Sequence, residues 1–224
     1  MSAANSVLDD VRRALGRNVT KVPEVLPPFI EPHNAIELTG QVNRFIQEAS
    51  AVRAQIHQCS KPQLNSRVAE ICATLKGELA ISESSLFPES DLSKYLESHG
   101  VSILKENTLD HDQMIEKLAN CAAGLTTADY AIAETGTIVL SSDEKNSLLV
   151  SLLPPVHIAV IRADQIFATL AEVIGLIGSE RSGRPAPARS VSFITGPSRT
   201  SDVELVLSIG VHGPKELHVI ILDS

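Results

Sequence analysis

The chain has 224 residues, of which 43% are hydrophobic and 21% charged, and its formal net charge is -8. This length accommodates one domain with a substantial core and a smaller appendage. The acidic balance argues against nucleic acid as a partner, because phosphate binding needs a concentrated basic field.

The three cysteines, Cys59, Cys72 and Cys121, lie far apart and form no Cys-x-x-Cys pair. Neither a zinc site nor a cysteine-ligated iron–sulfur cluster is therefore expected in this chain. The odd cysteine count, and a start without a basic segment followed by an apolar one, predict a reducing, cytoplasmic location. No run approaches the roughly 18 apolar residues of a membrane helix, so direct membrane insertion is not expected.

The first quarter of the chain has the pattern of an extension rather than a domain. Apolar side chains at helical spacing predict a short helix over residues 5–15. Proline-rich residues 22–32 are expected to form an extended arm, either an ordered linker or an arm that docks on another subunit. A longer helix is predicted over residues 36–59. We therefore expect a helical, proline-containing extension at residues 1–60 and an α/β domain at residues 61–224.

Beyond residue 60, predicted helices and short strands alternate. The helices are expected at residues 64–76, 91–99, 112–120, 164–177 and 200–208. The strands are expected at residues 78–82, 101–104, 122–126, 130–133, 137–141, 156–161, 191–194 and 217–222. The strands around residues 134–136 suggest a hairpin, and Asp164 is a good N-cap for its helix. This alternation is typical of an open, mainly parallel sheet with helices on both faces, in which ligands bind beyond the carboxyl ends of the strands.

The densest group of functional side chains lies between residues 195 and 214. Gly196 follows a strand-like run, Ser198 and Thr200 can cap the helix expected next, and Arg199 adds a fixed positive charge. Exposed N–H groups at such a strand-to-helix turn bind anions. We therefore predict a pocket for a small anionic ligand, with contacts from Gly196, Ser198, Arg199, Thr200, Asp202 and Gly213.

Several of these side chains have an alternative, structural role. Arg199 either holds the anion or pairs with Asp202 or Glu134. Asp202 lies one helical turn after Ser198, so it either meets the ligand or completes a cap. His212 lies in a glycine-rich loop and either donates to a carboxylate or keto oxygen or bonds a neighbouring carbonyl.

A second group surrounds Glu134, a carboxylate between two apolar runs. Burial there would raise its pKa toward general acid/base use, whereas the alternative is a turn carboxylate that accepts backbone N–H groups. Thr135, Gly136 and Thr137 can form a small nest for an anion or simply a turn. Glu134 and His212 are thus the catalytic candidates.

The other histidines in strand-like runs, His157 and His218, are expected to lie in the core. A metal site built from His157, His212 and Glu134 is not expected, because their spacing offers no close pair of ligands. The chain also lacks a Gly-x-Gly-x-x-Gly motif, so no dinucleotide cofactor is indicated.

Together, residues 128–140, 195–214 and 217–222 resemble the LUD-domain family, and within it the lactate-utilization protein C branch. The resemblance covers roughly residues 126–222 and rests on long motifs of mixed chemistry. It implies the open α/β fold of the NagB, RpiA and CoA-transferase group, which agrees with the periodicity.

The resemblance also implies a function. It implies a cytoplasmic, accessory component of L-lactate oxidation to pyruvate that acts with iron–sulfur partner proteins, the clusters being in those partners and no cofactor in this chain. One alternative is a free-standing enzyme that uses Glu134 as the nucleophile of CoA transfer or the base of sugar-phosphate isomerisation. Another is a non-catalytic assembly module. The sequence leaves the oligomeric state and the identity of the ligand open.

Overall fold

The computed structural model describes residues 13, 14, 16, 38–82, 89–105, 111–142, 148–183, 190–201, 207–209 and 212–223. The chain divides into two compact units, residues 1–30 and 31–224. The helix expected at residues 5–15 and the arm expected at residues 22–32 fall outside the described residues, apart from positions 13 and 14. All the elements below belong to the second unit.

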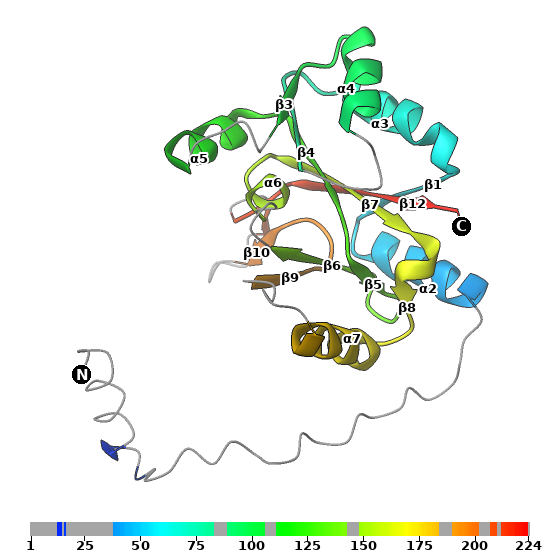
Figure 1. Cartoon of the computed structure of the whole chain (residues 1–224), viewed down its shortest axis with the longest axis vertical. Coiled ribbons are helices and arrows are strands. Elements are labelled where there is room, and N and C mark those ends of the chain that lie inside the picture. The colour runs from blue at the N-terminus through cyan, green and yellow to red at the C-terminus, as the bar shows by residue number, and fades with distance from the viewer. Residues whose placement is uncertain are drawn as a thin grey trace. The chain divides into compact units, whose positions relative to one another are not determined.

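The centre of this unit is a six-stranded sheet in which every pair of neighbours is parallel (Figure 1). In spatial order the strands are β1 (Gln55–Cys59), β12 (Glu216–Leu222), β7 (Val156–Arg162), β4 (Ala123–Thr127), β2 (Leu79–Ile81) and β3 (Ile103–Lys105). The two middle strands β12 and β7 are buried along almost their whole length, as a continuous apolar run predicts. The expectation of an open, mainly parallel α/β sheet is confirmed.

Both faces of the sheet are covered. One face packs against α3 (Leu64–Cys72) and α4 (Glu89–Ser98), and the other against α2 (Leu38–Ala51), α5 (His111–Asn120) and the short α6 (Leu149–Leu152). The helix α6 lies so close to β4 that a Cβ at Gly124 would collide with the carbonyl oxygen of Val150.

A smaller, four-stranded sheet joins the face that carries α2. Its strands in spatial order are β8 (Ile166–Phe167), β5 (Tyr130–Ile132), β6 (Thr137–Ser142) and β9 (Ser190–Ile194). The antiparallel pairing of β5 with β6 confirms the expected hairpin. The helix α7 (Leu170–Gly183) lies beside this sheet in Figure 1 and packs on its outer face through Val173. The inner face packs on α2 and the large sheet.

The prediction of one helix over residues 36–59 is correct to Ala51 and wrong beyond it. Arg53 has a φ of 70°, a left-handed conformation that cannot continue an α-helix. The following residues then pair with β12 as strand β1. Helix α2 and strand β1 therefore pack within the second unit.

The helix predicted over residues 164–177 begins later than expected. Asp164 does not cap it but pairs with Arg162, whose Nε lies 2.8 Å from its Oδ1. Residues Ala163–Gln165 form one 3-10 turn, β8 follows, and α7 starts only at Leu170. Ile166 and Phe167 pair with β5 as strand β8 instead of entering the helix, so the helix starts later in the chain.

The helix predicted over residues 200–208 is wrong. Arg199–Ser201 and Leu207–Ile209 form the antiparallel strands β10 and β11, with Thr200 opposite Ser208. An isolated helix of this length is only marginally stable, whereas the pairing of β10 with β11 gives backbone N–H and C=O groups hydrogen-bond partners.

His157 of β7 is the most deeply buried histidine among the described residues, with 1% of its surface exposed. Its Nε2 lies 2.9 Å from the hydroxyl of Thr126, and its Nδ1 has no hydrogen-bond partner among the described residues. Burial lowers the pKa of His157 to about 3. His218 is also buried, so both histidines lie in the core as predicted.

We expect this burial to make the protein less stable in acid. His157 stays neutral when folded but takes up a proton near pH 6.5 when unfolded, so its contribution is present above pH 6.5 and is lost toward pH 3. Between these values the free energy of unfolding should fall by up to roughly 1.4 kcal/mol per pH unit from this group. His57 and His218, whose pKa values burial also lowers, add to the same trend. Urea unfolding from pH 7 to pH 5 measures the slope.

The substitution His157→Gln keeps a partner for Thr126 but cannot titrate, so it should make this slope shallower than in the wild type. The control Gln58→Asn, at an exposed position of β1, removes no ionisable group and should leave the slope as it is. Equal slopes in the wild type and His157→Gln would contradict the prediction.

Candidate functional site

A cavity of about 470 Å³ opens between the segment that joins β9 to β10 and the segment before β12. Its wall brings together five of the predicted site residues: Gly196, Ser198, Arg199, His212 and Gly213. Residues 192–194 of β9 and residues 151–152 at the end of α6 form most of the remaining lining. The two halves of the glycine-rich motif therefore do meet in one place.

The cavity lies at the amino ends of β7 and β12. The residues just before these strands are held together, since the Lys215 amide donates to the Pro155 carbonyl at 2.7 Å. This cavity therefore does not lie at the carboxyl ends of the parallel strands, where a ligand site was expected. The reason is the connection: the motif joins the antiparallel β9 to the start of β12, so it lies where β12 begins.

The two wall segments touch through their main chains. The Ser198 amide donates to the Pro214 carbonyl at 2.9 Å, and a Cβ on Gly213 would lie 3.3 Å from that of Ser198. Gly196 has a φ of 80°, and a Cβ there would lie 2.6 Å from the Val52 carbonyl oxygen. A side chain at position 196 would therefore both strain the backbone and push the loop away from the end of α2.

Arg199 is exposed, and its Nη2 donates to the carbonyl oxygen of Val52 just beyond the carboxyl end of α2. Helix carboxyl ends carry a partial negative charge, so the guanidinium is well placed there. Among the described residues Arg199 forms no ion pair with Glu134. A guanidinium carries five N–H donors, and one bond to Val52 does not exhaust its capacity for an anion.

A chain of three hydroxyls joins the β5–β6 turn to the cavity. The Oγ1 atoms of Thr135 and Thr137 lie 2.7 Å apart, and those of Thr137 and Thr195 also lie 2.7 Å apart. Thr137 is buried, while Thr195 belongs to the cavity wall. Gly136 between the threonines has a φ of 63° and lies so close to Ala49 of α2 that no Cβ would fit. The turn thus supports the cavity wall through its hydroxyls.

Glu134 begins this turn but points to another element. Its Oε1 accepts from the Leu170 amide at 2.7 Å, at the first residue of α7. Glu172 caps the same helix end, its Oε2 accepting from the amides of Ala168 and Thr169. The described residues that line the cavity do not include Glu134. The structure therefore places Glu134 as a helix cap, while its use as an acid, base or nucleophile stays a prediction.

Two of the predicted contact residues, Thr200 and Asp202, are not fully described by the structure. The backbone of Thr200 lies in β10, but its side chain, like the whole of Asp202, falls outside the described residues.

The sequence missed part of the wall, namely Val52, Ser151, Leu152, Ser192 and Phe193. Ser151 and Leu152 precede β7 as His212 to Pro214 precede β12. Because neighbouring parallel strands start at the same edge, this shared position is a signal that could have found them. No local signal marks Val52.

Within the described ranges, no three histidine, cysteine, aspartate or glutamate side chains gather in a way that could hold a metal ion. His57 Nε2 and His218 Nδ1 lie 3.1 Å apart and bond each other directly. Among the described helices, none has the length and apolar character needed to cross a bilayer.

Comparisons with known proteins agree with one another. The family model of the LUD domain matches residues 42–222. The chain is 33% identical over 206 residues to a protein from Deinococcus radiodurans named lactate utilization protein C, covering 89% of this chain and 87% of that protein. A protein of the same name from Halalkalibacterium halodurans is 26% identical over 226 residues, covering 97% of this chain and 96% of that one.

A solved structure also has this fold. The crystal structure of a DUF162 family protein from Deinococcus radiodurans matches with a TM-score of 0.61 at 24% identity, covering 84% of this chain and 99% of that chain. At this level of identity the likeness shows a shared fold.

The position of Glu134 predicts a measurable loss of stability. Replacing it by alanine, Glu134→Ala, removes the acceptor for the Leu170 amide and should lower the free energy of unfolding by about 1 kcal/mol, as for other helix caps. Glu134→Gln keeps an acceptor oxygen and should restore most of this loss. Urea unfolding at pH 7 measures both.

The matched control is Glu97→Ala, at an exposed position on α4, which should change stability by less than about 0.5 kcal/mol. If Glu134→Ala were as stable as this control, the capping role would be refuted.

Proposed function

Because the chain belongs to the LUD-domain family, we propose that it acts in lactate utilization, as the accessory subunit of a cytoplasmic system that oxidises L-lactate to pyruvate. Relatives that share most of their length with it are named lactate utilization protein C. In this proposal the iron–sulfur partner proteins carry the electrons, and this chain binds a small anion.

The observation that carries the proposal is that Arg199, Ser198 and His212 line the same cavity. A guanidinium can hold a carboxylate through two parallel N–H bonds. Imidazole and hydroxyl groups in the same wall add donors for the 2-hydroxyl or 2-keto oxygen that lactate and pyruvate carry next to the carboxylate. The described wall contains no aspartate or glutamate, so no carboxylate of that wall repels an anion.

The state of the cysteines supports the assignment of the clusters to partners. Iron–sulfur clusters are held by several thiolates together. Here all three cysteines are buried, and burial raises the pKa of Cys72 and of Cys121 to about 11, which favours the protonated thiol. The chain therefore has no evident set of thiolates with which to hold a cluster of its own.

The position of Glu134 favours the accessory role over the alternative of a free-standing enzyme. One oxygen of this carboxylate already accepts the first amide of α7, which holds the side chain at the start of that helix. CoA transfer or isomerisation through Glu134 would also need a substrate outside the cavity described above.

We expect millimolar L-lactate, pyruvate or phosphate to raise the melting temperature of the protein. At ten times its Kd, a ligand stabilises by about 1.4 kcal/mol, which corresponds to roughly 3–6 °C for a chain of this size. Arg199→Ala should abolish the shift. The control Arg162→Ala should retain it, because Arg162 is an exposed, ion-paired arginine at the opposite, carboxyl end of β7. Absence of a shift with all three anions in the wild type would reject the anion pocket.

The role in a complex has its own test. The tagged protein, purified from its native cells, should co-purify with iron–sulfur proteins, and the purified material should reduce a dye when L-lactate is added. The control Arg162→Ala should give the same partners and the same dye reduction. With Arg199→Ala the partners should still co-purify but the dye reduction should fall. A protein recovered alone, without activity, would argue for a different function.

A further inference from the structure

The cavity is larger than a three-carbon acid requires. Lactate has six heavy atoms and displaces roughly the volume of three to four water molecules, about 100 Å³ at ~30 Å³ each. The cavity measures about 470 Å³, within the size range of sites that enclose ligands of drug size. A ligand that fills it must have a body beyond its charged group.

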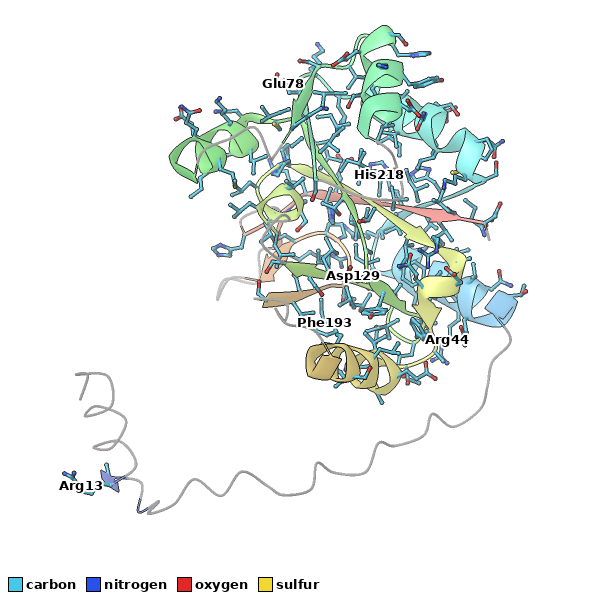
Figure 2. All side chains as sticks on the ribbon, viewed as in Figure 1. Arg13, Arg44, Glu78, Asp129, Phe193 and His218 are labelled. Atoms are coloured by element: carbon cyan, nitrogen blue, oxygen red, sulfur yellow. The ribbon has the colours of Figure 1, made fainter. Side chains whose placement is uncertain are left out.

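Part of the wall is apolar and exposed. Phe193 on β9, labelled in Figure 2, is 42% exposed, and Leu152 of α6 is 38% exposed. They are two of the five large exposed hydrophobic side chains of the described residues, and both line this cavity. Pro197 and Pro214 enlarge the same apolar lining. Exposed apolar surface gathered in a concave site is typical of ligand binding.

The rest of the side-chain lining is polar. Arg199 and His212 supply the charged and titratable groups, and Thr195 and Ser198 supply hydroxyls. The Oγ1 atoms of Thr195 and of the buried Thr137 lie 2.7 Å apart, so a hydrogen bond from the small sheet holds this wall in place. The cavity thus combines a positively charged wall with an apolar one.

We propose that this cavity binds an organic anion with an apolar or aromatic body, its charged group held by Arg199 and its body packed on Phe193 and Leu152. The inference rests on the anion pocket of the proposed function and narrows its ligand class, from any small anion to amphiphilic ones. Covering Phe193 and Leu152 would remove apolar surface from water, which is the main source of affinity in sites of this kind.

Two probes test the inference on the full chain. L-Lactate and L-3-phenyllactate carry the same 2-hydroxycarboxylate group, but only phenyllactate adds an aromatic ring. By isothermal titration calorimetry we expect phenyllactate to bind with a Kd at least tenfold lower. In Phe193→Ser and in Leu152→Ser this ratio should fall below about three. The control Ile115→Ser removes an exposed isoleucine of α5 outside the cavity and should leave the ratio unchanged.

The outcomes separate the inference from the proposed function. Equal Kd values for the two acids would overturn the inference and leave the anion pocket standing. Binding of neither acid would overturn the pocket and the inference with it. Tight binding of phenyllactate that neither substitution weakens would overturn the assignment of the apolar wall. Circular dichroism melting checks that each variant is folded, and the two substitutions lie on different elements, so either one alone can decide.

Discussion

The close approach of two segments to the carboxyl end of α2 is the constraint on which the candidate site depends. The β5–β6 turn approaches Ala49, and the segment between β9 and β10 approaches Val52. Both approaches are possible only because Gly136 and Gly196 have no side chain and accept a positive φ. Because both glycines contact the same helix end, they fix where the wall of the cavity stands relative to the two sheets.

Polar bonds then add to this packing. The bond from Arg199 to the Val52 carbonyl ties the charged wall to α2, and the bond between Thr137 and Thr195 ties the small sheet to the same wall. Each bond joins residues far apart in the chain, so it holds two distant segments together at this wall. The cavity therefore depends on contacts among α2, the small sheet and the start of β12 rather than on any one loop.

The architecture and the residues of the motif could be predicted from the sequence. The buried run of β7 and the hairpin at Glu134 have clear local patterns, and the cluster from Gly196 to Gly213 is unusual in its chemistry. What failed depends on tertiary contacts. The end of α2 near Arg53 is decided by the pairing of β1 with β12, and the ladder of Arg199 with Ile209 by the pairing of two separate segments. For Glu134 the sequence left a catalytic and a turn-carboxylate role open, because its partner, the Leu170 amide, belongs to another element. Local propensity carries no information about such partners.

The place of the cavity in the fold has a consequence for its motions. Its base is attached to β7 and β12, which form the most buried pair of strands and should open only when the whole unit unfolds. Its walls consist of part of β9, the end of α6 and connecting segments, and most of the wall residues are partly or fully exposed. Amide hydrogen exchange should therefore be slow beneath the cavity and fast around it. A bound ligand would change the protection of the walls alone, so the fold can adjust to its ligand without disturbing its core.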